Sequence, residues 1–349
     1  MTSKERILNT LERKPVDRAP ADIWMTGEVF NKLADHFGTA EEKEIYRKLG
    51  VDKIYWLSAP YTEIKPSKEN PDEDEIFNEW GACYKPKAYE DGEYLENSYY
   101  PLKAMETVEE VENYNWPDPD KFDFQALASS WLNHKDEATM LSFVSLFETY
   151  TSLRSFDEAL MDLYINQDFL RAALKKLADI QIEYIKRSLT AAPGIDLVYY
   201  SDDMGMQDRQ IIPTEVWSEF IEPHAARVIE TVHSFGKKVF YHSDGSAFEI
   251  VEKLVNLGVD VINPIQYICP GMERDVLKEK LGDRVIFHGA VENQNVLPFG
   301  TAEDVKQEVN DCKKILGEGG GYIVAPCHNL QPNTPVENII ALYQAAADV

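Results

Sequence analysis

The sequence predicts an α/β protein, and within that class a (β/α)8 TIM barrel with an inserted excursion after the second strand. In the second half of the chain, short apolar runs alternate with longer segments of helical spacing. This alternation, with strands that are apolar throughout, is typical of a parallel sheet covered on both faces. Eight strands can be placed, which is the number that closes a barrel. A doubly wound open sheet stays an alternative, because strand order is not visible in a sequence.

The strands are predicted from runs of β-branched, aromatic and aliphatic residues bounded by turn residues. Five regular ones are Asp196–Tyr200, Lys238–Tyr241, Val259–Asn263, Val285–His288 and Tyr322–Ala325, and three less regular ones are Ala19–Trp24, Lys53–Leu57 and Leu141–Leu146. Between them, Pro213–Phe235 and Ala302–Leu316 have the length of crossover helices. Gly236 and Gly317 directly follow these two segments, where glycine commonly ends a helix.

A long insertion separates the second and third predicted strands and runs from Tyr61 to about Ala138. Within it, Glu79–Tyr100 alternates aromatic and polar residues around Gly92, which predicts a β-hairpin excursion. The segment Thr107–Tyr114 that follows is predicted to be helical. The chain has no internal repeat, low-complexity tract or flexible linker. We therefore expect one barrel domain over residues 1–349.

Composition narrows the classes of partner and compartment. With 61 acidic and 35 basic residues the net charge is −26, which repels nucleic acid and anionic lipid surfaces. No apolar run reaches the ~20 residues that a membrane-spanning helix needs, and the N-terminus is polar. The four cysteines lie far apart and do not form a disulfide framework. We expect a cytoplasmic protein with no nucleic-acid or membrane partner.

Polar side chains stand where the predicted strands end, and in a (β/α)8 barrel these ends face a common cavity that holds the active site. In chain order they are Asp22, Trp24, Asp202, Asp203, Gln207, His242, Asp244, Asn263, Gln266, His288, Glu292, Cys327 and His328. Asp22, Trp24, Gln207, Asn263, Gln266 and Glu292 are predicted to bind substrate.

His242 and Asp244 are two residues apart at a strand end, a spacing at which both can reach one metal ion or substrate group. The alternative is a buried histidine that is hydrogen-bonded to Asp244. Cys327 and His328 add two candidate zinc ligands, of which we expect one to enter the cavity, because neighbours on a strand point to opposite faces. Cys327 could equally be a small buried apolar residue.

Asp202 and Asp203 are candidate catalytic acids, because close carboxylates raise one pKa, although either could instead cap a helix. His288 is a weaker catalytic candidate. The other histidines, which are His36, His134, His224 and His233, are interpreted as structural or surface groups. The sequence lacks GxGxxG, GxxxxGK[ST], GxSxG and HExxH motifs, which disfavours dinucleotide, nucleotide, serine-hydrolase and HExxH metalloprotease chemistry.

Four segments, residues 4–20, 201–245, 287–309 and 319–345, together resemble the uroporphyrinogen decarboxylase superfamily along nearly the whole chain. The resemblance implies a (β/α)8 barrel. True decarboxylases of the superfamily carry an arginine-rich stretch just after the first strand that binds the substrate's carboxylates. The matching region here, ADIWMTGEVFNK, contains no arginine. The resemblance is therefore to the other branch, the zinc methyltransferases that work with corrinoid proteins.

In the thiol methyltransferases of that branch, a His-x-Cys and a late Cys hold zinc. Matched residue to residue, His242, Asp244 and His328 occupy these positions, with Cys327 as an alternative ligand one residue away. Carboxylate and imidazole in place of thiolates make a harder metal site.

The resemblance implies a methyltransferase that moves a methyl group from a methoxylated or methylated small substrate to the cobalt of a partner corrinoid protein. Zinc is expected to assist this transfer, and either the metal or Asp203 is expected to bind or protonate the leaving oxygen or nitrogen. One alternative is a carboxy-lyase acting on a polycarboxylate or tetrapyrrole, and another is a non-catalytic scaffold barrel. The sequence leaves both a monomer and a homodimer open.

Overall fold

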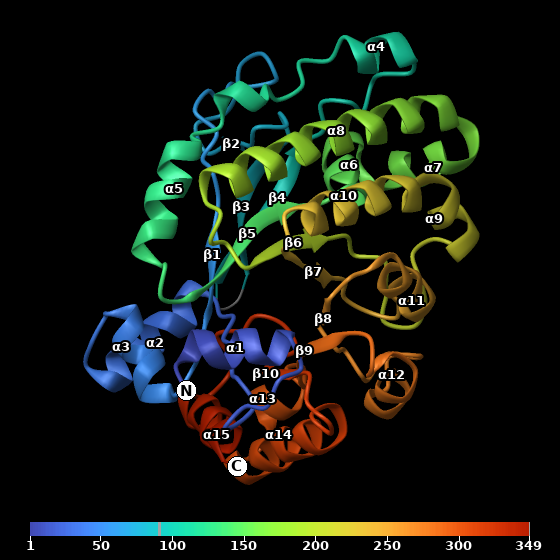
Figure 1. The fold of residues 1–349 in the computed structure, drawn as a ribbon. Helices are drawn as coiled ribbons and strands as arrows, with labels where there is room; N and C mark the ends of the chain where they lie inside the picture. Colours follow the sequence, from blue (N-terminus) through green and yellow to red (C-terminus); the bar gives the residue numbers. More distant parts are fainter. Residues whose placement is uncertain (90–91, 349) are drawn as a thin grey trace.

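A parallel sheet of seven strands forms the centre of the computed structural model, which describes residues 1–89 and 92–348 (Figure 1). The strands are β1 (Ile54–Leu57), β5 (Ala138–Val144), β6 (Leu197–Ser201), β7 (Lys238–His242), β8 (Val261–Asn263), β9 (Ile286–Val291) and β10 (Tyr322–Pro326). Each strand pairs with the next one along the chain, so the order is sequential. Sequential parallel order is that of a barrel and excludes the doubly wound alternative, because a doubly wound sheet reverses direction at a switch point.

The predicted first strand, Ala19–Trp24, is the exception, because it forms only isolated bridges. The Asp22 N–H donates to Val324 O at 2.8 Å, and the Asp52 N–H donates to Ala21 O at 2.7 Å. Pro20 cannot donate a ladder hydrogen bond, and the Asp22 carboxylate replaces a backbone acceptor for the Ile54 N–H at 3.1 Å. This irregular segment nevertheless joins β10 to the start of β1 and so closes the ring.

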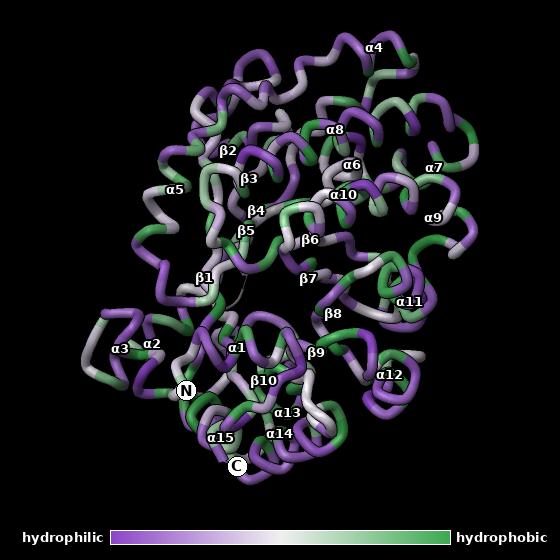
Figure 2. Tube along the Cα trace, in the orientation of Figure 1, coloured by the Kyte–Doolittle hydropathy of each residue, from purple (hydrophilic) through white to green (hydrophobic). Residues whose placement is uncertain are grey.

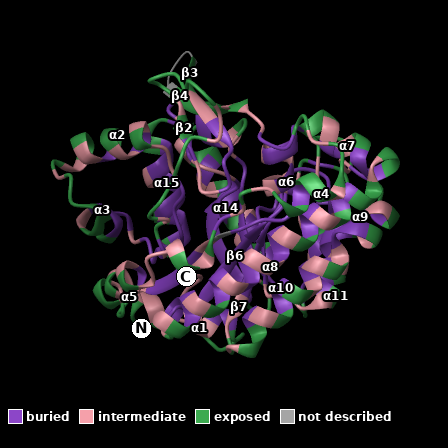
Figure 3. Ribbon diagram, turned by 90° about the horizontal axis from the view of Figure 1, so that it is seen from above, coloured by how far each residue is buried: buried purple, intermediate pink, exposed green. Residues whose placement is uncertain are grey.

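Helices surround the sheet (Figure 1), hydrophilic and hydrophobic residues alternate along them (Figure 2), and their exposed residues lie mainly on the outside of the molecule (Figure 3). They are α1 (Ser3–Leu11), α2 (Gly27–Phe37), α3 (Glu42–Leu49), α6 (Phe147–Arg154), α7 (Phe156–Ile165), α8 (Gln167–Ala191), α9 (Thr214–Phe220), α10 (Glu222–Ser234), α11 (Phe248–Leu257), α12 (Arg274–Leu281), α13 (Val296–Phe299), α14 (Ala302–Leu316) and α15 (Val336–Ala347). In Figure 1 the blue α2 and α3 lie beside the red α15, which brings the two ends of the chain together.

Two predicted crossover helices have different outcomes. The Ala302–Leu316 prediction is confirmed by α14, which begins with a capping box between Thr301 and Asp304. The Pro213–Phe235 segment is helical as expected but divides into two helices, α9 and α10, at Ile221. Pro223 lies in the first turn of α10, where its missing N–H interrupts the hydrogen-bond ladder.

Two hydrophobic cores result. A small inner core fills the barrel below the strand ends and includes Trp24, Tyr199 and Phe240, with Ile7 and Leu11 of α1 closing the bottom. A larger outer core lies between the sheet and the helices. The polar residues at the strand ends therefore lie directly above this inner core.

The insertion contains a second, antiparallel sheet of β2 (Ile76–Phe77), β3 (Cys83–Tyr89) and β4 (Gly92–Tyr99), followed by α4 (Val108–Glu112), a short 3-10 helix (Pro119–Lys121) and α5 (Phe124–Asn133). This confirms the predicted hairpin, whose residues 90–91 lie outside the described ones. The predicted helix at Thr107–Tyr114 is α4, with Thr107 as its N-cap. The third barrel strand begins at Ala138, three residues earlier than predicted.

A buried ion pair ties this insertion to the barrel helices. The Arg154 guanidinium donates from Nε to Asp162 Oδ2 at 2.7 Å and from Nη2 to Oδ1 at 3.1 Å. Its Nη1 donates to the carbonyls of Leu102 at 2.7 Å and Met105 at 2.6 Å, which belong to the insertion. Arg154 and Asp162 are both buried, so one side chain links α6, α7 and the insertion.

Among the described residues, no helix combines the length and the apolar character needed to cross a membrane.

Candidate metal centre at the barrel mouth

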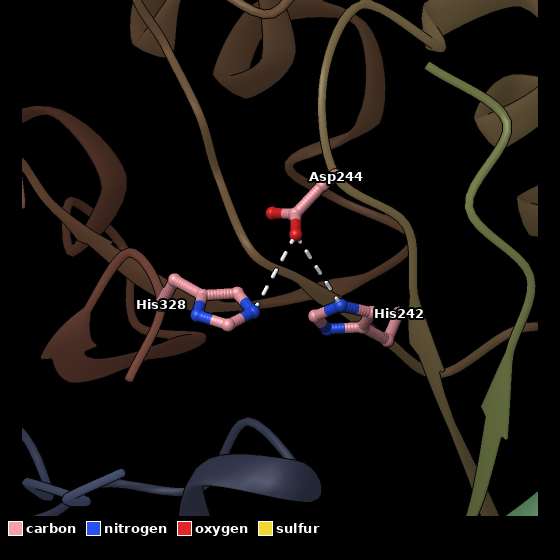
Figure 4. Close-up of side chains that lie close together, drawn as sticks. All are labelled: His242, Asp244 and His328. Carbon is pink, nitrogen blue, oxygen red and sulfur yellow. Dashed lines mark ion pairs between the residues drawn. The ribbon is translucent and has the colours of Figure 1, made fainter. Parts of the chain in front are cut away.

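Three side chains meet where β7 and β10 end. His242 is the last residue of β7, Asp244 lies two residues beyond it, and His328 lies two residues beyond β10. Asp244 Oδ2 is 3.8 Å from His242 Nε2 and 3.6 Å from His328 Nε2. Figure 4 shows the carboxylate between the two imidazoles, and one ligand atom from each residue lies within 4.8 Å of the others.

The donor set fits zinc. Ligands about 2.0–2.2 Å from a tetrahedral zinc ion are roughly 3.3–3.6 Å apart, and the two distances from the Asp244 carboxylate to the imidazoles, 3.8 and 3.6 Å, are within a few tenths of an ångström of this range. The pKa of Asp244 is raised overall, mainly by burial. The charge of Asp203 also raises it, while the two imidazoles lower it. A cation placed among these groups would favour the carboxylate form. Two histidines and a carboxylate leave a fourth position free, which is typical of catalytic rather than structural zinc sites.

A close contact between two glycines places Asp244. Gly205, after β6, packs against the backbone of Asp244 and Gly245, after β7. Gly245 has a φ of +77°, a conformation that favours glycine. The Ser246 N–H donates to Met206 O at 2.8 Å, so the two loops are also joined by a backbone hydrogen bond.

Replacing Gly205 with alanine is expected to displace the loop that carries Asp244, because the new Cβ would lie 2.6 Å from the Gly245 carbonyl carbon. Overpacking of this kind typically costs about 1–3 kcal/mol. Urea unfolding and zinc competition with a chelator should both show weakening. Gly27→Ala is the matched control, since a Cβ there meets nothing within 4 Å. Equal stability and zinc affinity in the two variants would contradict this account.

A cavity of about 620 Å³ opens beside the centre and includes both histidines in its wall. Its remaining lining includes the aromatic residues Trp24, Trp56 and Tyr199. The Trp24 ring stacks on His242 with 5.9 Å between centroids, and Trp56 packs edge-on against Tyr199 at 4.5 Å. The candidate ligand atoms of His242 and His328 therefore stand at the edge of a chamber whose wall is partly aromatic.

Two further carboxylates lie next to the three ligands. Asp203 Oδ1 accepts the Asp244 N–H at 2.9 Å and lies 3.7 Å from His242 Nε2. Glu148, at the start of α6, accepts a hydrogen bond from Ser201 Oγ at 2.9 Å. Burial, and then the charge of Asp203, raise the pKa of Glu148, while Ser201 and His242 lower it. The mouth is thus acidic on the side facing β6.

A line of buried polar groups runs from His242 into the barrel. His242 Nδ1 is 2.6 Å from Asn263 Oδ1, and Asn263 Nδ2 is 2.8 Å from His288 Nδ1. His288 Nε2 is in turn 3.2 Å from Asp22 Oδ2. Asp22, Asn263 and His288 are at most 2% exposed, so the structure places them beneath the centre rather than at its open side.

The model of one protein family, uroporphyrinogen decarboxylase (URO-D), matches residues 89–349, which is most of the chain. The chain belongs to the uroporphyrinogen decarboxylase family. The solved structure of a methyltransferase from Methanosarcina mazei has the same fold, with a TM-score of 0.66, 19% identity, and coverage of 99% of this chain and 98% of that one.

Sequence relatives of this family member are uroporphyrinogen decarboxylases at low identity. That of Coxiella burnetii is 26% identical over 197 residues, which cover 56% of this chain and 51% of the relative. The matched part thus spans about half the length of that protein. That of Christiangramia forsetii is 21% identical over 362 residues, which cover 100% of this chain and 99% of the relative.

The chamber of this protein has few lysines or arginines that could bind the carboxylates of a substrate, among the described residues. Among the described residues that line the chamber, Lys53 is the only lysine or arginine, and it is already engaged. Its Nζ lies 3.5 Å from Asp22 Oδ1 and donates to Ile23 O at 2.8 Å. Lys32, the one cation of the ADIWMTGEVFNK stretch, donates to the carbonyl of Pro332. This side of the family member's chamber carries no arginine clamp.

The structure separates the two predicted acids, Asp202 and Asp203. Asp202 is buried and accepts the Glu148 N–H at 2.9 Å, the Ser145 hydroxyl at 3.2 Å and the Tyr200 hydroxyl at 2.9 Å. It therefore caps α6, and burial raises its pKa to about 7. Of the two, only Asp203 borders the metal-binding atoms.

Two predicted substrate-binding residues, Gln266 and Glu292, hold loops through backbone hydrogen bonds. Gln266 Oε1 accepts the Gly245 N–H at 2.9 Å, and Gln266 Nε2 donates to Gln207 Oε1 at 3.2 Å. Glu292 accepts backbone N–H groups of Gln294, Asn295 and Val296 ahead of and within α13. Gln207 is exposed above the mouth. Trp24, by contrast, lines the chamber.

Cys327, the alternative ligand, lies outside the three-residue group. It is 5% exposed, and burial raises the pKa of its thiol well above the usual range. All four cysteines are free and buried.

We expect Cys327→Ser to bind zinc with unchanged affinity, because the ligand set of two imidazoles and a carboxylate contains no thiolate. Competition with a chromogenic chelator measures this directly. The matched change His328→Ser should weaken binding. If Cys327→Ser loses zinc while His328→Ser keeps it, Cys327 is the ligand and His328 is not.

Sequence reasoning missed Glu148 and Lys53. Glu148 follows β5 by four residues and the predicted strand Leu141–Leu146 by two. Its position after a strand end is the sequence signal that identifies it. Lys53 precedes its strand, at the end where active-site residues are not expected, and it reaches the chamber because the ring is irregular beside it.

Proposed function

We propose that this protein is the methyltransferase component of a corrinoid-dependent system. It would move a methyl group from a methoxylated or methylated small molecule to the cobalt of a partner corrinoid protein. The observation that carries the proposal is the cluster of His242, Asp244 and His328 at the edge of a chamber of about 620 Å³. The shared fold with a methyltransferase from Methanosarcina mazei is consistent with it.

His242, Asp244 and His328 would hold the metal. When bound, zinc would supply a Lewis acid that polarises the oxygen or nitrogen bearing the methyl group. The aromatic side chains of Trp24, Trp56 and Tyr199 suit the apolar body of a small methoxylated compound, and polar lining residues such as Thr26 and Asn329 would orient it.

Asp203 is the residue that we expect to protonate the leaving group. Transfer of the methyl carbon to the partner's cobalt would break the carbon–oxygen bond and leave its electron pair on the oxygen. Asp203, 3.7 Å from His242 Nε2 and 45% exposed, would relay a proton from solvent to that oxygen.

The chamber is less suited to a decarboxylase substrate with many carboxylates. Glu42 and Lys53 are its charged lining residues among those described, and Lys53 is paired with Asp22. Substrate carboxylates are generally held by unpaired arginines or lysines, which this wall does not offer.

The experiment combines metal analysis with a transfer assay. We expect the purified protein to take up one zinc ion per chain. With reduced cobalamin as acceptor, a panel of methoxylated aromatic compounds and methylated amines is tested for methylcobalamin formation by its absorption spectrum. No zinc uptake after reconstitution would contradict the zinc-assisted mechanism. Release of carbon dioxide from uroporphyrinogen, without methyl transfer from any donor, would support the carboxy-lyase instead.

A further inference from the structure

The buried polar line beneath the candidate metal centre has a fixed direction. It begins at Asp22, a carboxylate that accepts hydrogen bonds from Trp24 Nε1 at 3.0 Å and from the Ile54 N–H at 3.1 Å. Burial raises the pKa of Asp22, but the charge of Lys53 and the hydrogen bond from His288 outweigh burial and lower the pKa to about 2. An ionised carboxylate can only accept, so His288 must donate to it from Nε2.

The next two hydrogen bonds run in the same direction. The backbone carbonyl of His288, 3.5 Å from Asn263 Nδ2, can only accept, so Asn263 presents its amide nitrogen to His288. His288 Nδ1, 2.8 Å from the same nitrogen, is then the acceptor of the second hydrogen bond. The Asn263 carbonyl oxygen is then left facing His242 Nδ1 at 2.6 Å, where it can only accept. The lone pair of His242 Nε2 therefore faces Asp244.

We propose that Asp22, His288 and Asn263 are positioning residues, which hold His242 in the tautomer whose Nε2 can bind a metal ion. The proposal rests on the metal site proposed above. It gives these residues a role other than the substrate-binding and catalytic ones that their sequence positions suggest. None of the three needs to touch substrate, and Asp22 acts through two intervening side chains.

Asp22 must act only as a hydrogen-bond acceptor for the line to keep its direction. Its replacement by asparagine keeps the size and shape of the side chain but adds a donor. The asparagine oxygen would stay with the Ile54 N–H and Lys53, so its nitrogen would face His288 Nε2 and lose the hydrogen bond from Trp24 Nε1. Each hydrogen bond of the line would then reverse, so that His242 would donate from Nε2 and lose its free lone pair there. Two side chains, His288 and Asn263, lie between Asp22 and His242 in the line, and Asp22 is not one of the candidate metal ligands.

The first test needs neither metal nor substrate. Two-dimensional ¹H–¹⁵N spectra of the ¹⁵N-histidine-labelled protein distinguish protonated from unprotonated ring nitrogens, and the chain has seven histidines. At pH ~8, where a histidine of ordinary pKa is neutral, His242 of the chelator-treated protein is expected to carry its proton on Nδ1. A proton on Nε2 would overturn the proposal.

The second test uses variants and zinc itself. Asp22→Asn is expected to shift His242 to the Nε2 tautomer and to weaken zinc binding by ~10–100-fold, the usual cost of losing an outer hydrogen-bond partner of a metal ligand. Asn263→Leu should do the same, and Asn263→Asp should keep the acceptor oxygen and restore affinity. Asp162→Asn is the control, since Asp162 is also buried but pairs with Arg154, outside the line.

The outcomes separate this proposal from the proposed function. Wild-type tautomer and zinc affinity in both Asp22→Asn and Asn263→Leu would overturn the positioning role. An Nδ1 tautomer that reverses in Asp22→Asn, in a protein that never binds zinc, would support the hydrogen-bond line and contradict the metal site.

Discussion

Replacing His242 with alanine is expected to remove zinc binding, and with it any methyl transfer that the protein supports. One of three protein ligands is lost, so the affinity should fall by more than the ~10–100-fold typical of an outer hydrogen-bond partner. His328→Ala removes the ligand on the opposite side of Asp244 and should have the same effect. Isothermal titration with zinc, together with the cobalamin methylation assay, measures both consequences.

The control for these variants is His36→Ala, which removes an exposed histidine on α2, far from the cluster in sequence. It should bind zinc as the wild type does. Circular dichroism must show that His242→Ala stays folded, which we expect because its ring lies at the edge of a cavity. Retention of full zinc affinity in both His242→Ala and His328→Ala would exclude the proposed centre.

Asp162→Ala is expected to cause the largest loss of stability, about 3–5 kcal/mol of unfolding free energy. The substitution leaves the Arg154 guanidinium buried without its bidentate partner, although three carbonyls still accept from Nη1. Because those carbonyls belong to the insertion, its attachment to α6 should loosen as well. Urea unfolding, followed by tyrosine and tryptophan fluorescence, gives the free-energy difference.

Asp179→Ala is the matched control for this ion pair. Asp179 also pairs with an arginine, Arg227, but both side chains are more than a third exposed. Exposed pairs contribute ~0–1 kcal/mol, so this variant should be nearly as stable as the wild type. The paired replacement of Arg154 by Met and Asp162 by Leu should cost less than Asp162→Ala, because it leaves no buried charge. Similar losses for Asp162→Ala and Asp179→Ala would contradict the assigned role.

Strand positions could be predicted from sequence where a strand is apolar and bounded by turns. The strands β6, β7 and β10 differ from their predicted bounds by at most one residue at each end. The prediction failed at Ala19–Trp24, where hydrogen bonds come partly from the Asp22 side chain. It shifted at β5, whose first residues include the polar Thr139, held by Asp196 from the neighbouring strand.

The candidate site also has a part that the sequence predicts and a part that it does not. His242, Asp244 and His328 follow apolar strands directly, so their positions alone predict that they share one end of the barrel, and the structure brings them together. The polar line through Asn263 and His288 to Asp22 could not be predicted. Its hydrogen bonds join residues 25 and 266 positions apart, and their donor direction depends on the charge at one end. Sequence position identifies which residues gather, and packing decides which of them reach the open side.

The close packing of Gly205 against Gly245 also bears on how this centre could be altered by evolution or in the laboratory. The loops after β6 and β7 fit only as a matched pair, so lengthening or exchanging one of them would disrupt the other. New metal preferences are therefore more accessible through single replacements at position 244 than through loop grafting. A mutant library for this barrel should keep both glycines fixed and vary the side chain between the two imidazoles.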